Sequence, residues 1–137
     1  MPRHPKKPRR LVADGRTYLW TLRHSHSETD TGRSCRETLT LYPQPADTGR
    51  PLRIVFDQGP ARYVPGGAPM GSGDIGFVQG PDLNLHEPGA VRALLDAASA
   101  RGWQPEGRRA VEFDGWSLLE AAAALRAGDT GPAGSAK

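Results

Sequence analysis

The sequence has little cysteine, few aromatic residues and no long apolar run. With one cysteine among 137 residues, the chain cannot form an internal disulfide, which favours a reducing compartment and predicts a cytoplasmic protein. No apolar run approaches the roughly 20 residues that a membrane-spanning helix needs, so we expect no membrane segment. The basic start leads into Leu11–Arg16 rather than into an apolar stretch, so a secretory signal peptide is not expected either.

Glycine and proline are abundant, whereas apolar residues are scarce. The chain contains 17 glycines and 13 prolines, and 36% of its residues are hydrophobic. This length suits one domain with a modest core, and the glycine and proline content predicts flexible segments beside it. We expect a flexible basic arm over residues 1–10, a single domain over 11–127 and a disordered tail over 128–137. Residues 57–74 lack any periodicity and are expected to form a long loop.

Positive charge is concentrated at the start of the chain. The sequence carries 18 Lys and Arg against 15 Asp and Glu, but five of the basic residues and no acid lie in residues 1–10, which leaves −2 for the rest. These five are candidates for contact with nucleic acid or an acidic surface: Arg3, Lys6, Lys7, Arg9 and Arg10. A solvated leader without a partner is the alternative, because charge runs are usually solvated.

Alternating apolar residues predict a sheet in the first half of the domain. Asp14 and Gly15 tolerate the positive φ of a type I′ turn, so they predict a hairpin. A polar loop is expected over residues 25–34. Strands are expected at 11–13, 16–24, 35–42 and 52–56, with shorter candidates at 75–78, 83–85 and 110–113.

Two helices are predicted in the second half. Apolar residues recur at helical spacing from Val91 to Ala98, with Pro88 suited to the first turn and Gly102 to the C-terminal cap. Asp114 is expected to cap a second helix over residues 115–127. Together the elements predict an α+β fold, a mainly antiparallel β-sheet with two helices packed on one face.

Three histidines and the cysteine form a candidate functional site. His24 and His26 alternate along a strand, and pairing of the strands around the polar loop would bring Cys35 to the same end and face. His86 precedes the first helix. Imidazole and thiolate are ligands that zinc prefers, so these four residues are candidate ligands of a divalent metal such as zinc. The alternatives are polar residues beside a small buried cysteine, or a reactive Cys–His pair oriented by Glu37.

The remaining aromatic residues divide into core and loop. The tyrosine and tryptophans on apolar faces or at helix caps are predicted to be core: Tyr18, Trp20, Trp103 and Trp116. Tyr63 and Met70 lie in the long irregular loop, where they are candidates for lining a pocket or a partner surface.

Four segments covering most of residues 16–121 carry specific patterns: RTYLWTLRH, CRETLTLYP, LNLHEPGAVRALLDAASARGW and FDGWSLLEA. The most specific is the Asn-Leu-His-x-Pro-Gly run that enters a helix ending in Arg-Gly-Trp. On these segments the chain resembles a group of small proteins of high-GC actinobacteria, such as Streptomyces, for which no activity is established. The resemblance implies a lineage and a compartment, and it supplies no catalytic residue.

No complete catalytic constellation is visible in the sequence. We therefore expect a small intracellular, non-enzymatic module that binds an unknown protein or small ligand, with no membrane contact. One alternative is a metal-binding protein that uses the histidine and cysteine cluster. The other is a nucleic-acid-associated accessory protein that acts through the basic arm.

Overall fold

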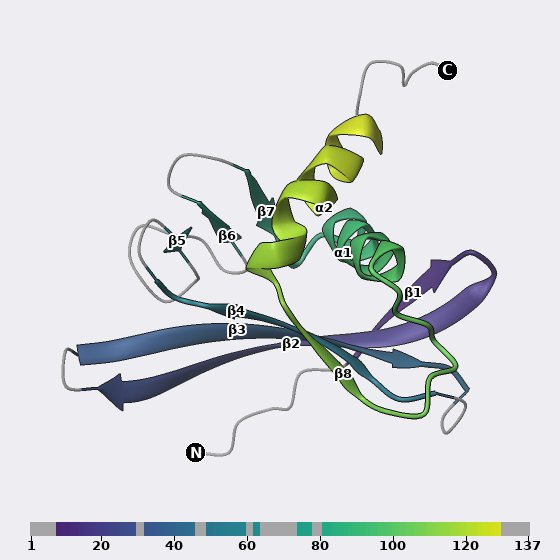
Figure 1. Ribbon diagram of the computed structural model, residues 1–137, viewed down its shortest axis with the longest axis horizontal. Helices are drawn as coiled ribbons and strands as arrows, with labels where there is room; N and C mark the ends of the chain where they lie inside the picture. Colours follow the sequence, from purple (N-terminus) through teal and green to yellow (C-terminus); the bar gives the residue numbers. More distant parts are fainter. Residues whose placement is uncertain are drawn as a thin grey trace.

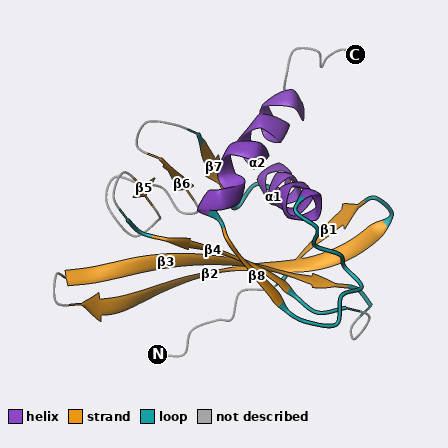
Figure 2. Cartoon of the chain, in the orientation of Figure 1, coloured by secondary structure: helices purple, strands orange, loops and turns teal. Residues whose placement is uncertain are grey.

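The computed structural model describes residues 8–29, 32–45, 49–59, 62–63, 74–77 and 81–129. These residues form strands and two helices whose order and bounds are β1 (Arg9–Ala13), β2 (Arg16–Thr29), β3 (Gly32–Pro43), β4 (Leu52–Asp57), β5 (Arg62–Tyr63), β6 (Asp74–Phe77), β7 (Asp82–Asn84), α1 (Pro88–Ala100), β8 (Val111–Asp114) and α2 (Trp116–Asp129) (Figures 1 and 2).

The strands form two sheets. The larger sheet has the order β1-β2-β3-β4-β8 and the smaller β5-β6-β7. All neighbouring strands are antiparallel except β4 and β8, which run parallel. Both helices lie on the same side of the larger sheet (Figure 1). The predicted α+β fold, with a mainly antiparallel sheet and two helices on one face, is therefore confirmed.

The turn between β1 and β2 confirms the predicted hairpin. Asp14 has a φ of 52° and Gly15 a φ of 77°, the left-handed conformation that a tight type I′ turn requires at both central residues. β1 starts at Arg9, two residues before the expected strand. Two residues that the sequence assigned to the arm, Arg9 and Arg10, are thus part of the sheet.

The hairpin of β2 and β3 is much longer than predicted. The two strands pair in register from Tyr18↔Pro43 to Thr29↔Gly32, so the expected polar loop over residues 25–34 is wrong. Strand pairing depends on backbone hydrogen bonds. This segment contains Ser, His and Thr residues and no proline. Its backbone can therefore form those hydrogen bonds even though no apolar pattern marks the strand.

The core fills the space between the larger sheet and the helices. Alternate residues of the strands face it: Leu22, Leu39, Leu41, Ile54 and their neighbours on the same face are buried. The four aromatic residues predicted to be core are all buried: Tyr18, Trp20, Trp103 and Trp116. Among the aromatic contacts, the Phe56 ring meets Trp116 edge to face, with centroids 5.2 Å apart and an interplanar angle of 88°.

The predicted signals at the start and end of α1 and at the start of α2 are present in the structure. α1 carries Pro88 in its first turn, and Gly102 follows it with a φ of +105° while the Trp103 amide donates to the Ala98 carbonyl at 3.1 Å. At the start of α2, the Asp114 carboxylate accepts a hydrogen bond from the Trp116 amide at 3.2 Å. Among the described residues, neither helix is long and apolar enough to cross a membrane.

Candidate functional site

The register of β2 and β3 brings two histidines opposite two predicted site residues. His24 pairs with Glu37, and His26 pairs with Cys35. By strand alternation these positions share the face on which Leu22 and Leu39 are buried. The expectation that Cys35 lies at the same end of the hairpin as the two histidines is therefore confirmed.

His24 and Glu37 form a close polar contact on this face. The His24 Nδ1 atom lies 2.7 Å from Glu37 Oε1, with side-chain exposures of 24% and 3%. A carboxylate only accepts, so Nδ1 is the donor when Glu37 is ionised. The sequence proposed Glu37 as the group that orients a histidine, and the Glu37–His24 contact agrees with that part of the hypothesis.

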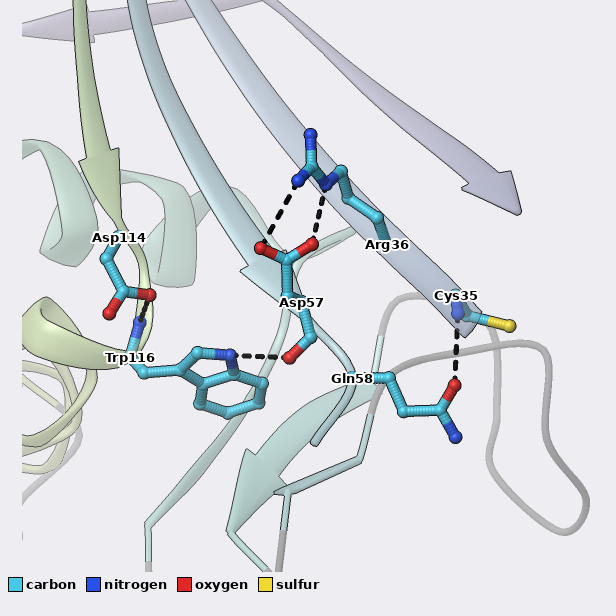
Figure 3. Close-up of polar contacts among 6 residues, drawn as sticks. All are labelled: Cys35, Arg36, Asp57, Gln58, Asp114 and Trp116. Carbon is cyan, nitrogen blue, oxygen red and sulfur yellow. Dashed lines mark hydrogen bonds and ion pairs between the residues drawn. The ribbon is translucent and has the colours of Figure 1, made fainter. Parts of the chain in front are cut away.

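Cys35 is held mainly through its backbone. Its amide donates to Gln58 Oε1 at 3.0 Å, and its carbonyl accepts from the Gln58 amide at 3.0 Å. Its side chain is buried, with 7% exposure. Beside it, Arg36 contacts Asp57 at 2.6 Å, and the Asp57 carbonyl accepts from Trp116 Nε1 at 2.8 Å (Figure 3). This network links the first half of β3 and the end of β4 to α2.

His86 lies in the turn between β7 and α1. Its amide donates to Asn84 Oδ1 at 2.9 Å, and its carbonyl accepts from Arg9 Nη1 at 2.7 Å. Arg9 pairs with Trp20 in the sheet, and four residues along an extended strand separate Trp20 from His24, or about 13 Å. The backbone of His86 is thus tied to a different part of β2 from the one that carries His24.

The described members of the predicted metal site do not assemble. His24, Cys35 and His86 are all described, and within the described ranges no group of three or more His, Cys, Asp or Glu side chains could hold a metal ion. The side chain of His26 lies outside what the structure describes. The four-ligand metal site therefore stays a prediction.

The other predicted site residues are only partly described. Arg3, Lys6, Lys7 and Met70 lie outside the described residues, and Tyr63 is placed only as a residue of β5. In β1, the Arg9 guanidinium lies 4.8 Å from the centroid of the Trp20 ring. This contact and the hydrogen bond to the His86 carbonyl hold the first residue of β1 against the core side of the sheet.

A further surface was not proposed from the sequence. Strand alternation directs every second side chain of β1, β2 and β3 away from the helices, and we call this surface the open face. Its described residues are Arg10, Val12, Thr17, Leu19, Thr21, Arg23, Ser25, Arg36, Thr38, Thr40 and Tyr42. It carries three arginines and no acidic residue, and in the part of the chain that the structure describes both helices lie on the opposite side of the sheet.

The apolar part of the open face is exposed at one end. Val12 is 55% exposed and Tyr42 is 41% exposed. Arg10 pairs with Leu19, and Leu19 pairs with Tyr42, so these three residues form a row across three strands. Strands lie about 4.8 Å apart, which places Arg10 and Tyr42 about 10 Å apart along the row.

The charges of the open face differ in their surroundings. Arg10 and Arg23 are exposed. Arg36 instead forms an ion pair with Asp57 of β4, and the hydrogen bond to Asp57 raises the pKa of the Arg36 guanidinium above its ordinary value. Across the sheet, the exposed Glu112 and Asp114 of β8 make the opposite edge acidic. Arg53 of β4 is exposed on the same side of the sheet, but it stands opposite Glu112 in the strand pairing. The exposed arginines without an acidic strand partner therefore lie on β1 and β2.

Sequence reasoning missed this surface although part of its signal was present. The alternation of Thr17, Leu19, Thr21 and Arg23 along β2 is readable in the sequence. The sequence does not reveal which side of the sheet the helices cover. It also does not reveal which residues of β1 and β3 lie beside those of β2, because that depends on the register.

No family model, curated protein or solved structure matches the chain. The resemblance to small actinobacterial proteins stays a prediction.

Proposed function

We propose that this protein is a non-enzymatic binding module that holds a polyanion on the open face. One observation carries the proposal: Arg10 and Arg23 are exposed where the described residues of β1, β2 and β3 on this side of the sheet include no acid, while Asp57, Glu112 and Asp114 of the same side lie on β4 and β8. The exposed Tyr42 and Val12 lie on the same surface. Arginine and tyrosine are enriched at binding surfaces, and an exposed apolar cluster with a polar rim is typical of them.

The charge distribution favours an anionic partner. A guanidinium presents several N–H donors in a fixed plane and binds phosphate or sulfate groups through paired hydrogen bonds. The residues preceding β1 add Arg3, Lys6 and Lys7 and no acid. These charges precede Arg9 in the sequence, and Arg9, the first residue of β1, is held by its contacts with Trp20 and His86.

The proposal does not use the polar groups of the opposite face. His24 and Glu37 form a polar pair there, and within the described ranges no group of three or more His, Cys, Asp or Glu side chains could hold a metal ion. The proposal therefore relies on the open face.

Retention on immobilised heparin tests the proposal with the full chain. The double variant Arg10→Ser/Arg23→Ser is expected to elute at a clearly lower salt concentration than the wild type, because each arginine removed takes one ionic interaction away from the polyanion. The matched variant Arg108→Ser/Arg109→Ser removes two exposed arginines from the loop before β8 and should shift elution by less than half as much. Equal shifts would mean that net charge, and not the open face, governs retention.

A further inference from the structure

We infer that the polyanion is a single-stranded nucleic acid, with a base stacked on Tyr42 and phosphates bound by Arg10 and Arg23. The inference rests on the proposed function and adds the identity of the ligand. It starts from the position of Tyr42, which is exposed beside Leu19 and one strand further from Arg10.

The row of Arg10, Leu19 and Tyr42 combines the two contacts that a single strand needs. Unpaired bases stack on aromatic side chains whatever their sequence, while the backbone follows a positively charged track. Arg10 lies about 10 Å from Tyr42 across the strands, and Arg23 lies about 13 Å from Leu19 along β2. A short stretch of single strand spans both distances, so one ligand can meet the ring and both guanidinium groups.

Two partly exposed hydroxyl groups lie near the tyrosine on the same face. Thr17 and Thr21 flank Leu19, the strand partner of Tyr42, along β2, whereas Thr40 beside Tyr42 on β3 is buried. Threonine hydroxyls donate to phosphates and both donate to and accept from base edges. The open face therefore offers a polar border around an exposed ring, which suits unpaired bases better than a purely apolar partner.

The exposed ring favours a single strand over a duplex. Sheets that carry exposed aromatic residues bind two or three unpaired bases, whereas a base inside a duplex is already stacked on its neighbours and does not reach such a ring. Within the described ranges, α1 and α2 lie on the other side of the larger sheet (Figure 1). The exposed Glu112 on β8 repels phosphates at the far edge, so the strand is expected to lie over β1, β2 and β3.

Fluorescence anisotropy with labelled oligonucleotides tests the inference on the full chain. The probes are mixed-sequence 20-mers of single-stranded RNA and DNA, and the duplex of the same DNA sequence. The wild type is expected to bind a single strand more tightly than the duplex, and the RNA and DNA arms decide which single strand is preferred. Tyr42→Ser should weaken single-strand binding by about 5- to 150-fold, the range for one stacked base, while Tyr42→Phe keeps it within about twofold.

Heparin distinguishes stacking from a general loss of structure, because it has no bases. Tyr42→Ser should lower the salt concentration of heparin elution by much less than Arg10→Ser/Arg23→Ser does, and the apolar variant Tyr42→Leu should behave like Tyr42→Ser on both ligands. Equal losses on heparin and oligonucleotide would assign Tyr42 a merely structural role and overturn the inference.

The two proposals can fail separately. If heparin retention depends on Arg10 and Arg23 but Tyr42→Ser leaves oligonucleotide binding unchanged, or if the duplex binds as tightly as the single strands, the single-strand inference is wrong and the polyanion module stands. If neither ligand responds to Arg10→Ser/Arg23→Ser more than to Arg108→Ser/Arg109→Ser, both are wrong. On the oligonucleotide, the first double variant should reduce the slope of log K against log salt by about 1.4, because two phosphates are no longer neutralised by arginine.

Discussion

The junction between β8 and α2 contains a glycine that leaves no room for a side chain. A Cβ atom at Gly115 would lie 2.5 Å from Phe56 Cζ and 2.7 Å from Cδ1, whereas ordinary van der Waals contact begins at 3.4 Å. Phe56 is fully buried, and Trp116 packs against its ring at 5.2 Å. The substitution Gly115→Ala therefore forces the ring or the backbone to move by about 1 Å in a close-packed region.

The expected cost follows from two opposing effects. Overpacking a filled core costs about 1–3 kcal/mol, while replacing a glycine at a permitted φ returns about 0.4–1 kcal/mol through the unfolded chain. The backbone has little freedom to adjust, because the Gly115 amide donates to the Val55 carbonyl at 2.7 Å. We expect Gly115→Ala to lower the free energy of unfolding by about 1–2 kcal/mol and the Tm by about 4–8 °C.

Equilibrium unfolding in urea, followed by tryptophan fluorescence, measures the cost. The decisive comparison repeats Gly115→Ala in a Phe56→Leu background, where the smaller side chain no longer meets the new methyl group. Its cost should fall there by more than about 0.5 kcal/mol, the level at which neighbouring substitutions stop being additive. An equal cost in both backgrounds would refute the steric reasoning.

Two further predictions concern the cap of α2 and the buried tyrosine. Asp114→Ala removes the acceptor of the Trp116 amide and should lower the free energy of unfolding by about 1 kcal/mol, whereas Asp114→Asn keeps an acceptor and should cost much less; equal costs in urea would contradict the capping role. Burial raises the pKa of the Tyr18 phenol above 10.0, so its contribution to stability is complete below that pH and is lost as the pH rises above it. Tyr18→Phe should therefore lose less stability than the wild type between pH 9 and pH 11, roughly the range of tyrosine ionisation, while the exposed Tyr42→Phe control should follow the wild type.

Short-range signals made the turns and helices predictable. Asp14 and Gly15 take the left-handed conformation that their side chains tolerate, and Gly102 does the same after α1. The Asp114 cap forms as expected. Each of these features is decided by a few neighbouring residues, so the sequence contains the information locally.

The extension of β2 and β3 could not be read from apolar alternation. Most of residues 25–34 are polar, so they carry no buried face that would mark a strand. Their pairing instead continues the ladder that Leu22 and Leu39 establish further along the same strands. Once that register is set, the backbone groups of the following residues already lie opposite one another.

The candidate sites depended on pairing between distant residues. If β2 and β3 are assumed to pair as a hairpin, His24 is expected close to Glu37, and the structure contains this contact. The His86 carbonyl instead accepts a hydrogen bond from Arg9, which lies 77 positions earlier in the sequence. The open face required the register of three strands and the side on which the helices pack, and no local pattern supplies either.

The parallel pairing of β4 with β8 also constrains the order in which the protein can form during synthesis. The hydrogen bond from Trp116 to Asp57 joins residues 59 positions apart, whereas Thr29 and Gly32 close the longest hairpin at its tip. Strands β1 to β4 can therefore pair as they leave the ribosome, because their contacts are local. Until α1, β8 and α2 follow, the apolar side of that meander has no cover and the edge of β4 has no partner from its own chain. Such an edge is open to pairing with other chains, so the nascent protein passes through an aggregation-prone stage that its last helix ends.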